Sequence, residues 1–335
     1  MSRSIAFFET TPSEERYLKA RLGKDFQLTF SRDALSNDGL KKVNNIGILS
    51  VFIYSQVTTE TLKKLPKLRF ICTRSTGFNH IDVKSAHDRK IPVSNVPYYG
   101  ENTVAEHTFG LILSISRRIH KAYVRTAQNN FSIEGLQGFD LKRRTLGVVG
   151  AGSIGLHVIK MAKGFGMRVI AYDTKQNHFL AETLDFQYVS FEELLTRSDI
   201  ITFHCPYNKA THHLINMGNI ERIKKGAIIV NTARGGLIET AALHYGLDEG
   251  ILGGAGLDVF EGEELAKEEN QMLSKNVSIE NLRAILQRNV LLKRENVIVT
   301  PHIAFDSIEA VERILQTTCD NIRNFVNGKP TNVVN

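Results

Sequence analysis

Residues 146–173 read LGVVGAGSIGLHVIKMAKGFGMRVIAYD and decide the fold of the surrounding chain. An apolar run from Leu146 to Val149 leads into the turn Gly150-Ala151-Gly152-Ser153-Ile154-Gly155. A helix-like segment follows, and then a second apolar run that ends at Asp173. Strand, glycine turn, helix, strand and terminal acid are the parts of a dinucleotide-binding βαβ unit.

Each glycine of this turn has a predicted physical role. Gly150 allows a tight turn, Gly152 lets the backbone approach a pyrophosphate, and Gly155 lets the helix pack closely on the strand. Asp173 follows at about the spacing of 20 residues expected for an acid that binds the adenosine ribose, and its charge would repel a 2′-phosphate. The turn therefore predicts NAD as cofactor. The alternative is a glycine-rich turn of another α/β protein that binds nothing.

The composition is that of an ordinary soluble globular protein. The chain has 335 residues, 42% of them apolar and 23% charged, which predicts two domains and argues against disorder. The net charge of +7 is spread along the chain, with no long basic run interleaved with aromatic residues. We therefore expect no nucleic-acid partner, although a basic surface could attract small anionic substrates.

The cysteines and the apolar segments indicate in which cellular compartment the protein is found. Cys72, Cys205 and Cys319 are an odd number, far apart and without a CxxC motif, which indicates reduced thiols in the cytoplasm and no disulfide framework or metal site. The apolar run near the N-terminus is too short for a signal peptide. No apolar stretch approaches the roughly 20 residues needed to span a membrane.

Short apolar runs alternate with helix-like segments along most of the chain. The first 100 residues predict a small parallel α/β domain, with strands at 4–8, 26–30, 46–53 and 69–73. After a helix that opens near Thr103, residues 124–143 lack a clear period and are predicted to be a connecting loop. Further strands are predicted at 200–203, 227–231, 254–260 and 297–300, and a final helix at 307–326. The fold class is therefore α/β, with parallel sheets.

Several polar residues follow these strands in the same sense. In a parallel sheet such positions share the carboxyl edge, where the glycine turn also lies. The residues at this predicted edge are His204, Thr232, Arg234, Asp258, Glu263 and His302. In the first domain, the loop 73–80 (TRSTGFNH) also leaves a strand; it is either a plain turn or a loop whose backbone N–H groups hold a carboxylate.

Three of these residues suit the reduction of a 2-keto acid. The planar guanidinium of Arg234 can pair with the substrate's oxygens. His302 can donate a proton near neutral pH, and a carboxylate beside it would fix its tautomer and stabilise the imidazolium. Glu263 fits that last role, although its neighbours Glu261 and Glu264 are alternatives. The alternative for His302 is a loop histidine without a catalytic role. His107, inside a predicted helix, is interpreted as structural.

The sequence resembles the NAD-dependent D-isomer-specific 2-hydroxyacid dehydrogenases. The matching stretches span most of the chain in the family's order. They are STGFNHID (75–82), NVPYYGENTVAEHT (95–108), GVVGAGSIG (147–155), FHCPYNKATHHLIN (203–216), VNTARGGLIET (230–240), GLDVFEGEE (256–264) and TPHIAFDS (300–307). Tyr99 and the long segment between Glu263 and His302 look most like the D-lactate dehydrogenases of the family.

The resemblance implies roles for individual residues. Arg234 stands where the family has its substrate-binding arginine, Glu263 where it has its catalytic glutamate, and His302 where it has its acid/base histidine. The implied substrate contacts are the Thr76–Gly77 backbone, Tyr99 and Phe52. Besides the three glycines of the turn, the implied cofactor contacts are Ser153, Ile154, Asp173, Cys205, Pro206, Thr211, Thr232, Ala233 and Asp258.

The resemblance also implies an architecture with two doubly wound domains. A Rossmann NAD-binding domain of residues 101–302 would be inserted into a flavodoxin-like substrate domain formed by residues 1–100 and 303–335. The family is usually dimeric through the NAD-binding domains, with the active site in the cleft between the two domains.

The implied activity is the reversible, NADH-dependent reduction of a 2-keto acid to a D-2-hydroxy acid, with pyruvate and D-lactate as the first candidates. One alternative is a glyoxylate/hydroxypyruvate reductase or a dehydrogenase of bulkier D-2-hydroxy acids. Another is a non-enzymatic, NADH-sensing protein like the corepressors of the family. The sequence does not distinguish the physiological substrate, the preferred direction or the strictness of the preference for NAD over NADP.

Overall fold

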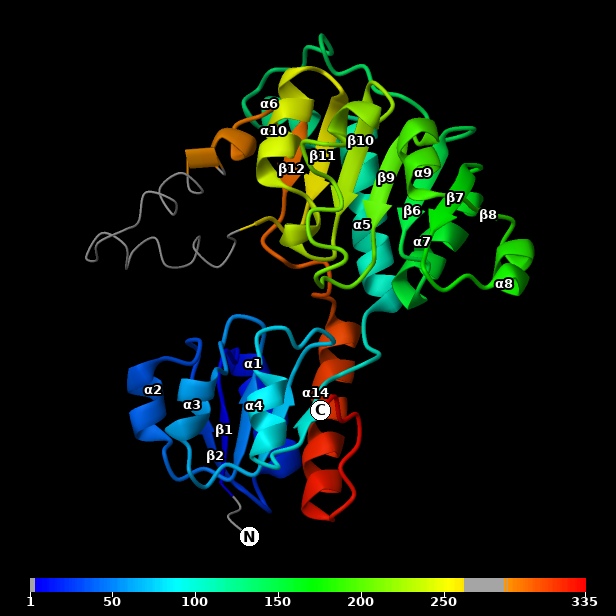
Figure 1. The fold of residues 1–335 in the computed structure, drawn as a ribbon. Coiled ribbons are helices and arrows are strands. Elements are labelled where there is room, and N and C mark those ends of the chain that lie inside the picture. Colours follow the sequence, from blue (N-terminus) through cyan, green and yellow to red (C-terminus); the bar gives the residue numbers. More distant parts are fainter. Residues whose placement is uncertain (1–3, 262–285, 288) are drawn as a thin grey trace. The chain divides into compact units, whose positions relative to one another are not determined.

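The computed structural model describes residues 4–261, 286–287 and 289–335. The chain divides into two compact units (Figure 1). Unit 1 comprises Met1–Tyr99 and Ser307–Asn335, and unit 2 comprises Gly100–Asp306. The chain thus leaves unit 1 after Tyr99 and returns to it at Ser307.

Unit 1 is built on a five-stranded sheet with the order β2-β1-β3-β4-β5, and all of its strand pairs are parallel. The strands are β1 (Ser4–Phe7), β2 (Gln27–Phe30), β3 (Ile48–Val51), β4 (Phe70–Thr73) and β5 (Val93–Ser94). This is the flavodoxin-like order, in which the connections reverse direction between β1 and β3.

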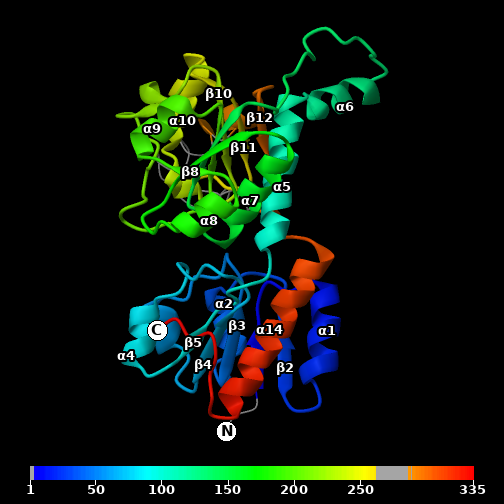
Figure 2. The ribbon, with the colours of Figure 1, turned by 90° about the vertical axis from the view of Figure 1, so that its right-hand side faces the viewer.

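Helices cover both faces of this sheet. Their bounds are α1 (Pro12–Leu22), α2 (Asn37–Lys42), α3 (Thr59–Lys63), α4 (Val83–Asp88) and α14 (Ile308–Val326). Apolar residues of α2, α3 and α4 pack in one core cluster with alternate strand residues such as Leu49 and Ile71. The other strand residues, such as Ile48 and Phe70, pack with α1 and α14 in a second cluster. In Figure 2, α1 and α14 lie on one side of the sheet and α4 on the other.

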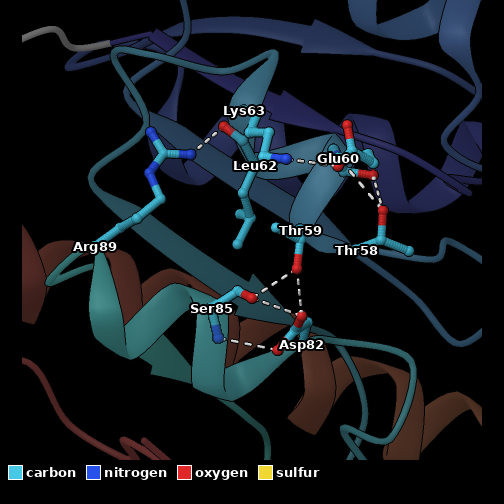
Figure 3. Close-up of polar contacts among 9 residues, drawn as sticks. Thr58, Thr59, Glu60, Leu62, Lys63, Asp82, Ser85 and Arg89 are labelled. Carbon is cyan, nitrogen blue, oxygen red and sulfur yellow. Dashed lines mark hydrogen bonds and ion pairs between the residues drawn. The ribbon is translucent and has the colours of Figure 1, made fainter.

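Polar contacts join α3 to α4 (Figure 3). The Thr59 hydroxyl donates to Asp82 Oδ2 at 2.7 Å, and the Arg89 guanidinium donates to the carbonyl oxygen of Leu62. Asp82 also caps α4 by accepting a hydrogen bond from the Ser85 N–H at 2.9 Å. Hydrogen bonds from the Ser85 hydroxyl, the Ser85 N–H and the Thr59 hydroxyl lower the pKa of Asp82 to about 2, so its carboxylate stays charged at neutral pH.

Unit 2 contains a seven-stranded parallel sheet with the order β12-β11-β10-β9-β6-β7-β8. Its strands are β6 (Thr145–Val149), β7 (Arg168–Tyr172), β8 (Gln187–Tyr188), β9 (Ile200–Phe203), β10 (Ala227–Asn231), β11 (Leu252–Leu257) and β12 (Val297–Val299). Numbered from β6, the first six strands have the Rossmann order 3-2-1-4-5-6, with β12 added beside β11.

Both faces of the unit 2 sheet are also covered. The helices and 3₁₀ turns are α5 (Glu101–Ser116), α6 (Ile119–Ala127), α7 (Ser153–Gly164), α8 (His178–Thr183), α9 (Phe191–Arg197), η1 (Ile220–Arg222), η2 (Gly235–Leu237) and α10 (Thr240–Asp248). Residues of α5, α7 and α8 share one core cluster with Leu146 and Val148, and residues of α9 and α10 share another with Val149. Burial on both faces explains the nearly continuous apolar runs of these strands.

The parallel α/β sheets predicted from the sequence are confirmed, whereas several local predictions are wrong. Helices α2 and α4 were not predicted, because six residues are too few for a clear 3.6-residue period. Residues 124–143 are not loop throughout, since α6 continues to Ala127. The helix expected to open near Thr103 begins at Glu101, with Gly100 as its N-cap. Within the described ranges, no helix is both long and apolar enough to cross a membrane.

Candidate active site

The glycine turn joins β6 to α7 at the carboxyl edge of the unit 2 sheet. Gly150 has a φ of +95°, and a Cβ atom there would lie 2.7 Å from the backbone nitrogen of Cys205. A Cβ atom on Gly155 would lie 2.0 Å from the carbonyl oxygen of Gly150. Both positions therefore require glycine, the first for the turn and the second for close packing of helix on strand.

The first turn of α7 is open to an anion. Gly152 is the N-cap residue of α7, and no side chain caps the helix. The backbone N–H groups of the first turn, which begins with Ser153 and Ile154, therefore have no side-chain acceptor at the cap. A Cβ atom on Gly152 would meet nothing within 4 Å. Free N–H groups, the positive end of the helix dipole and an open approach fit the pyrophosphate of a dinucleotide.

Asp173 lies at the end of β7, next to this turn. Its Oδ2 accepts a hydrogen bond from the Ala151 N–H at 2.8 Å, and its Oδ1 accepts one from the Lys175 N–H at 2.8 Å. The carboxylate is therefore held beside the glycine turn, where a ribose hydroxyl could reach it.

The segment after β9 borders the turn on the other side. Burial raises the pKa of the Cys205 thiol to about 11, so this thiol is protonated at neutral pH. Thr211 closes the loop by donating to the Pro206 carbonyl oxygen at 2.7 Å and accepting from the Asn208 N–H at 2.8 Å. The Thr211 side chain thus shapes the loop itself.

Arg234 follows β10 and is half-buried. Asn231 fixes its backbone: the Asn231 Oδ1 accepts from the Ala233 N–H at 3.0 Å, and the Asn231 Nδ2 donates to the Arg234 carbonyl oxygen at 2.8 Å. Among the described residues, the guanidinium donates only to the Ala233 carbonyl oxygen, at 2.6 Å. Arg234 can therefore offer its remaining donors to an anionic substrate. The hydroxyl of the neighbouring Thr232 points inward, 3.0 Å from that of Thr108.

A histidine–glutamate pair, His213 and Glu261, lies beside the segment that follows Arg234. His213 Nε2 lies 2.6 Å from Glu261 Oε1, and Glu261 Oε2 accepts from the N–H and the hydroxyl of Thr240 at 2.8 and 2.7 Å. The backbone N–H of His213 donates to the Gly236 carbonyl oxygen at 2.9 Å. Burial raises the pKa of Glu261, but the hydrogen bonds from His213 and Thr240 outweigh it, so the pKa lies below its usual value.

His302 follows β12 in a left-handed backbone conformation, with a φ of +56°. Its N–H donates to the Asp258 carbonyl oxygen at 3.0 Å. The buried Asp258 carboxylate accepts from the N–H groups of Ile303 and Ala304 at 2.9 and 2.8 Å and from the Thr300 hydroxyl at 2.5 Å. Asp258 thus fixes the backbone of the loop that carries His302, through hydrogen bonds from its N–H groups. Its assignment as a cofactor contact stays a prediction.

His107, on α5, supports the same loop. Its Nε2 lies 3.1 Å from the Thr300 hydroxyl and 3.6 Å from Asp258 Oδ1. These contacts agree with the structural interpretation of His107.

The remaining predicted substrate residues lie at the carboxyl edge of the unit 1 sheet. Phe52 follows β3, Thr76 and Gly77 follow β4, and Tyr99 follows β5. The Thr76 hydroxyl donates to the Val96 carbonyl oxygen at 2.8 Å, which anchors the loop; Thr76 is exposed and Gly77 is half-buried. Glu263 lies outside the described residues. Among those that are described, no three His, Cys, Asp or Glu side chains are grouped as a metal site.

The sequence of unit 2 matches a known family. The profile "D-isomer specific 2-hydroxyacid dehydrogenase, NAD binding domain" covers residues 109–304. The chain belongs to the D-isomer-specific 2-hydroxyacid dehydrogenases. This confirms the predicted family, its oxidoreductase class and NAD as its cofactor.

Relatives of this dehydrogenase match it over nearly their whole length. A 2-hydroxyacid dehydrogenase homolog of Haemophilus influenzae is 37% identical and the D-lactate dehydrogenase of Escherichia coli is 34% identical, each over 97% of both chains. The crystal structure of D-lactate dehydrogenase from Aquifex aeolicus with NAD and lactic acid matches with a TM-score of 0.88 and 36% identity. It covers 97% of this chain and 96% of that one.

Sequence reasoning missed the residues that hold the dehydrogenase's site in place. Asn231 carries a local signal, because asparagine favours bonds to the backbone two residues later. The hydrogen-bond partners of Glu261 and Asp258 lie more than 20 residues away along the chain, so no local sequence pattern indicates them.

His204 gives a prediction about stability and pH. Its Nε2 lies 2.9 Å from the Thr202 hydroxyl, and its buried Nδ1 has no hydrogen-bond partner in the described part of the chain. Burial lowers its pKa from 6.5 to about 3. Between these values the folded dehydrogenase binds fewer protons than the unfolded chain, so stability falls as pH drops through this window, by up to about 1.4 kcal/mol per pH unit.

The His204→Asn variant is therefore expected to lose less stability than the wild type between pH 6.5 and pH 4.5. Urea unfolding at several pH values measures this difference. His157→Asn, at an exposed position of α7, is the matched control and should leave the slope unchanged. Equal slopes for His204→Asn and the wild type would contradict a neutral His204 in the folded state.

Proposed function

We propose that this dehydrogenase reduces a small 2-keto acid to the D-2-hydroxy acid, with pyruvate and D-lactate as the first candidates. The proposal rests above all on the placement of Arg234 and His302 at the sheet edge that also carries the glycine turn and Asp173. Both loops are held by buried polar side chains, Asn231 and Asp258. This preorganisation supports catalysis. Relatives named as D-lactate dehydrogenases favour pyruvate.

Each residue has a distinct part in the proposed reaction. NADH, when bound at the Gly150–Gly155 turn, supplies the hydride for carbon 2 of the substrate. Arg234 pairs with the substrate carboxylate and polarises the carbonyl group. His302 donates the proton that the carbonyl oxygen takes up. For Glu263 we propose the orientation of His302, and for the Thr76–Gly77 backbone a second contact to the carboxylate.

The domain roles follow from the same proposal. We assign the cofactor to unit 2, including Cys205, Pro206, Thr211, Thr232, Ala233 and Asp258 as its predicted neighbours. We assign substrate selection to unit 1, with Phe52 and Tyr99 as the residues that contact the substrate's side chain.

A panel of 2-keto acids tests the function. Purified protein would be given NADH with pyruvate, phenylpyruvate, 2-ketoisocaproate, hydroxypyruvate or glyoxylate, and NADH oxidation would be followed. The largest kcat/KM is expected for pyruvate. A larger value for a bulkier acid or for glyoxylate would replace pyruvate as the substrate. Tight NADH binding without turnover of any acid would favour a sensor protein instead.

Asp173 should set the choice of cofactor. Replacing it with asparagine keeps a hydrogen-bond acceptor for the Ala151 N–H but removes the charge that repels a 2′-phosphate. We expect the ratio of kcat/KM for NADH to that for NADPH to fall about tenfold or more in Asp173→Asn and Asp173→Ala. Asp185→Asn, an exposed carboxylate of the same unit, is the control. An unchanged ratio in both Asp173 variants would show that this carboxylate does not bind the adenosine ribose.

We also propose a homodimer formed through unit 2. Helix α6 and the segment that follows it extend away from the sheet of unit 2 (Figure 2), and α6 has no buried residues. Both expose large apolar side chains. These are Ile119, Tyr123, Val124, Phe131 and Ile133, between 52 and 85% exposed. Arg125 orders the segment by donating to the carbonyl oxygens of Ser132 and Glu134, each at 2.7 Å. An ordered, exposed apolar surface of this kind suits a second copy of the chain.

The double variant Phe131→Asp/Ile133→Asp should therefore be monomeric, whereas we expect the wild type to sediment as a dimer. Phe179→Asp is the matched control, because Phe179 is a similarly exposed aromatic residue on α8, at 75%. Sedimentation velocity gives the masses. A wild-type monomer, or a dimer that survives the double substitution, would contradict this interface.

The location proposed from the sequence is the cytoplasm. It is supported by Cys72, Cys205 and Cys319, all of which are free thiols. Fractionation of cells that express the chain would test it, and recovery from a secreted or oxidising compartment would contradict it.

A further inference from the structure

Glu9 follows β1 in unit 1 and has an unusual backbone conformation. Its φ is +58°, in the left-handed region that residues other than glycine seldom adopt. Such a conformation persists only where the surroundings fix it, and it is found preferentially at functional sites.

The Glu9 carboxylate accepts hydrogen bonds from the loop that follows β3. The N–H groups of Phe52 and Ser55 donate to its Oε2 at 3.1 and 3.0 Å, and that of Tyr54 donates to its Oε1 at 2.9 Å. The Ser55 hydroxyl also donates to Oε2. Several backbone N–H groups that converge on one anion form a nest, and hydrogen bonds to a charged acceptor are strong.

Arg74 fixes the backbone of Glu9 from the other side. Arg74 is only 1% exposed, and its guanidinium donates to the carbonyl oxygens of Phe8 and Glu9 at 2.6 and 2.7 Å. It also donates to the Ser50 hydroxyl at 3.1 Å, and it lies 6.0 Å from the centre of the Phe52 ring. The segments after β1, β3 and β4 are thus joined through Glu9 and Arg74.

This junction occupies the switch point of the unit 1 sheet. In the order β2-β1-β3-β4-β5, the connections reverse direction between β1 and β3, and the crevice outside these strand ends is where open α/β sheets bind ligands. Here the carboxylate of Glu9, from the end of β1, binds the N–H groups after β3. The chain therefore supplies its own anion at that place.

We propose that Glu9 is a positioning residue, an internal anion whose carboxylate fixes the loop from Phe52 to Ser55 and thereby the substrate-contacting side chain of Phe52. This inference rests on the role proposed above for Phe52. Without the carboxylate, the converging N–H groups lose their shared acceptor and Phe52 loses its fixed position. The consequence is weaker binding of the 2-keto acid, while the glycine turn of unit 2 keeps its structure.

The variant Glu9→Gly tests this directly, because glycine accepts a positive φ and removes only the side chain. We expect KM for pyruvate to rise about tenfold or more, because misplaced substrate contacts are costly. The dissociation constant for NADH should stay unchanged. Added formate, a small carboxylate, should enter the vacated nest, bring KM back toward the wild-type value and raise the Tm of Glu9→Gly more than that of the wild type.

Two further variants complete the experiment. Glu9→Gln keeps the size of the side chain but turns one acceptor into a donor, so it should show a smaller rise in KM than Glu9→Gly. Glu60→Gln, which changes an exposed carboxylate of the same unit that pairs with Lys63 (Figure 3), should match the wild type with and without formate.

A wild-type KM in Glu9→Gly would overturn the proposal, as would a raised KM that formate does not lower. If Glu9→Gly does not fold, Glu9→Gln decides: a severalfold rise in KM with unchanged NADH binding supports the proposal, and an unchanged KM overturns it. If the wild type reduces no 2-keto acid, the proposed function fails on its own. The formate-dependent rise in Tm then still shows whether the Glu9 nest exists.

Discussion

Replacing His302 with glutamine is expected to lower kcat for the reduction of pyruvate by about 10²- to 10⁴-fold, the range that a general acid or base contributes. Glutamine can form hydrogen bonds but cannot deliver a proton near neutral pH. The loop should keep its place, because Asp258 binds the N–H groups of Ile303 and Ala304 whatever side chain stands at position 302. NADH binding, followed by fluorescence, should therefore stay close to that of the wild type.

The backbone at position 302 calls for a second variant. His302 has a φ of +56°, and asparagine adopts this conformation more readily than glutamine does. His302→Asn should lose as much kcat as His302→Gln if the lost proton donor is the cause. A loss confined to His302→Gln would point to backbone strain. The control is His87→Gln, an exposed position of α4, which should leave kcat unchanged. Full turnover in both His302 variants would remove this residue from the chemistry.

The sequence predicts those parts of the molecule whose cause is local. The glycine turn is an example: the positive φ of Gly150 and the close approach of Gly155 are properties of positions a few residues apart. The carboxyl edge is another, because parallel strands place every residue that follows them on one side. His204, Arg234, Asp258 and His302 could be assigned to that edge without any knowledge of which strands are neighbours.

The hydrogen bonds that hold the loops of the site in place could not be predicted in this way. Glu9 binds N–H groups 43 to 46 residues further along the chain, and Glu261 binds a histidine 48 residues before it. Such pairs depend on tertiary packing, and a single glutamate in a loop does not indicate its partner. Asp258 shows the same limit. Its place after β11 was predicted, but its carboxylate points behind the His302 loop and is buried there.

Replacing Arg234 with glutamine should have the second large effect, chiefly on substrate binding. A charged, bidentate partner for a carboxylate contributes about 1.5 to 3 kcal/mol per hydrogen bond, so kcat/KM for pyruvate should fall about 10²-fold or more. Arg234→Lys keeps the charge but not the planar fork, and should fall between the wild type and Arg234→Gln. Since Asn231 binds only the backbone of this loop, its conformation should survive both substitutions.

NADH binding separates this role from a general disturbance of unit 2. The dissociation constant for NADH should be unchanged in both Arg234 variants, and Arg222→Gln, at an exposed position of η1, should match the wild type in every measurement. An Arg234→Gln variant that bound NADH poorly would be a structural variant and would say nothing about the carboxylate. A variant with normal NADH binding and normal KM would assign the carboxylate to another group. The order wild type, lysine, glutamine, with constant NADH affinity, is the result expected for a guanidinium that binds the substrate carboxylate.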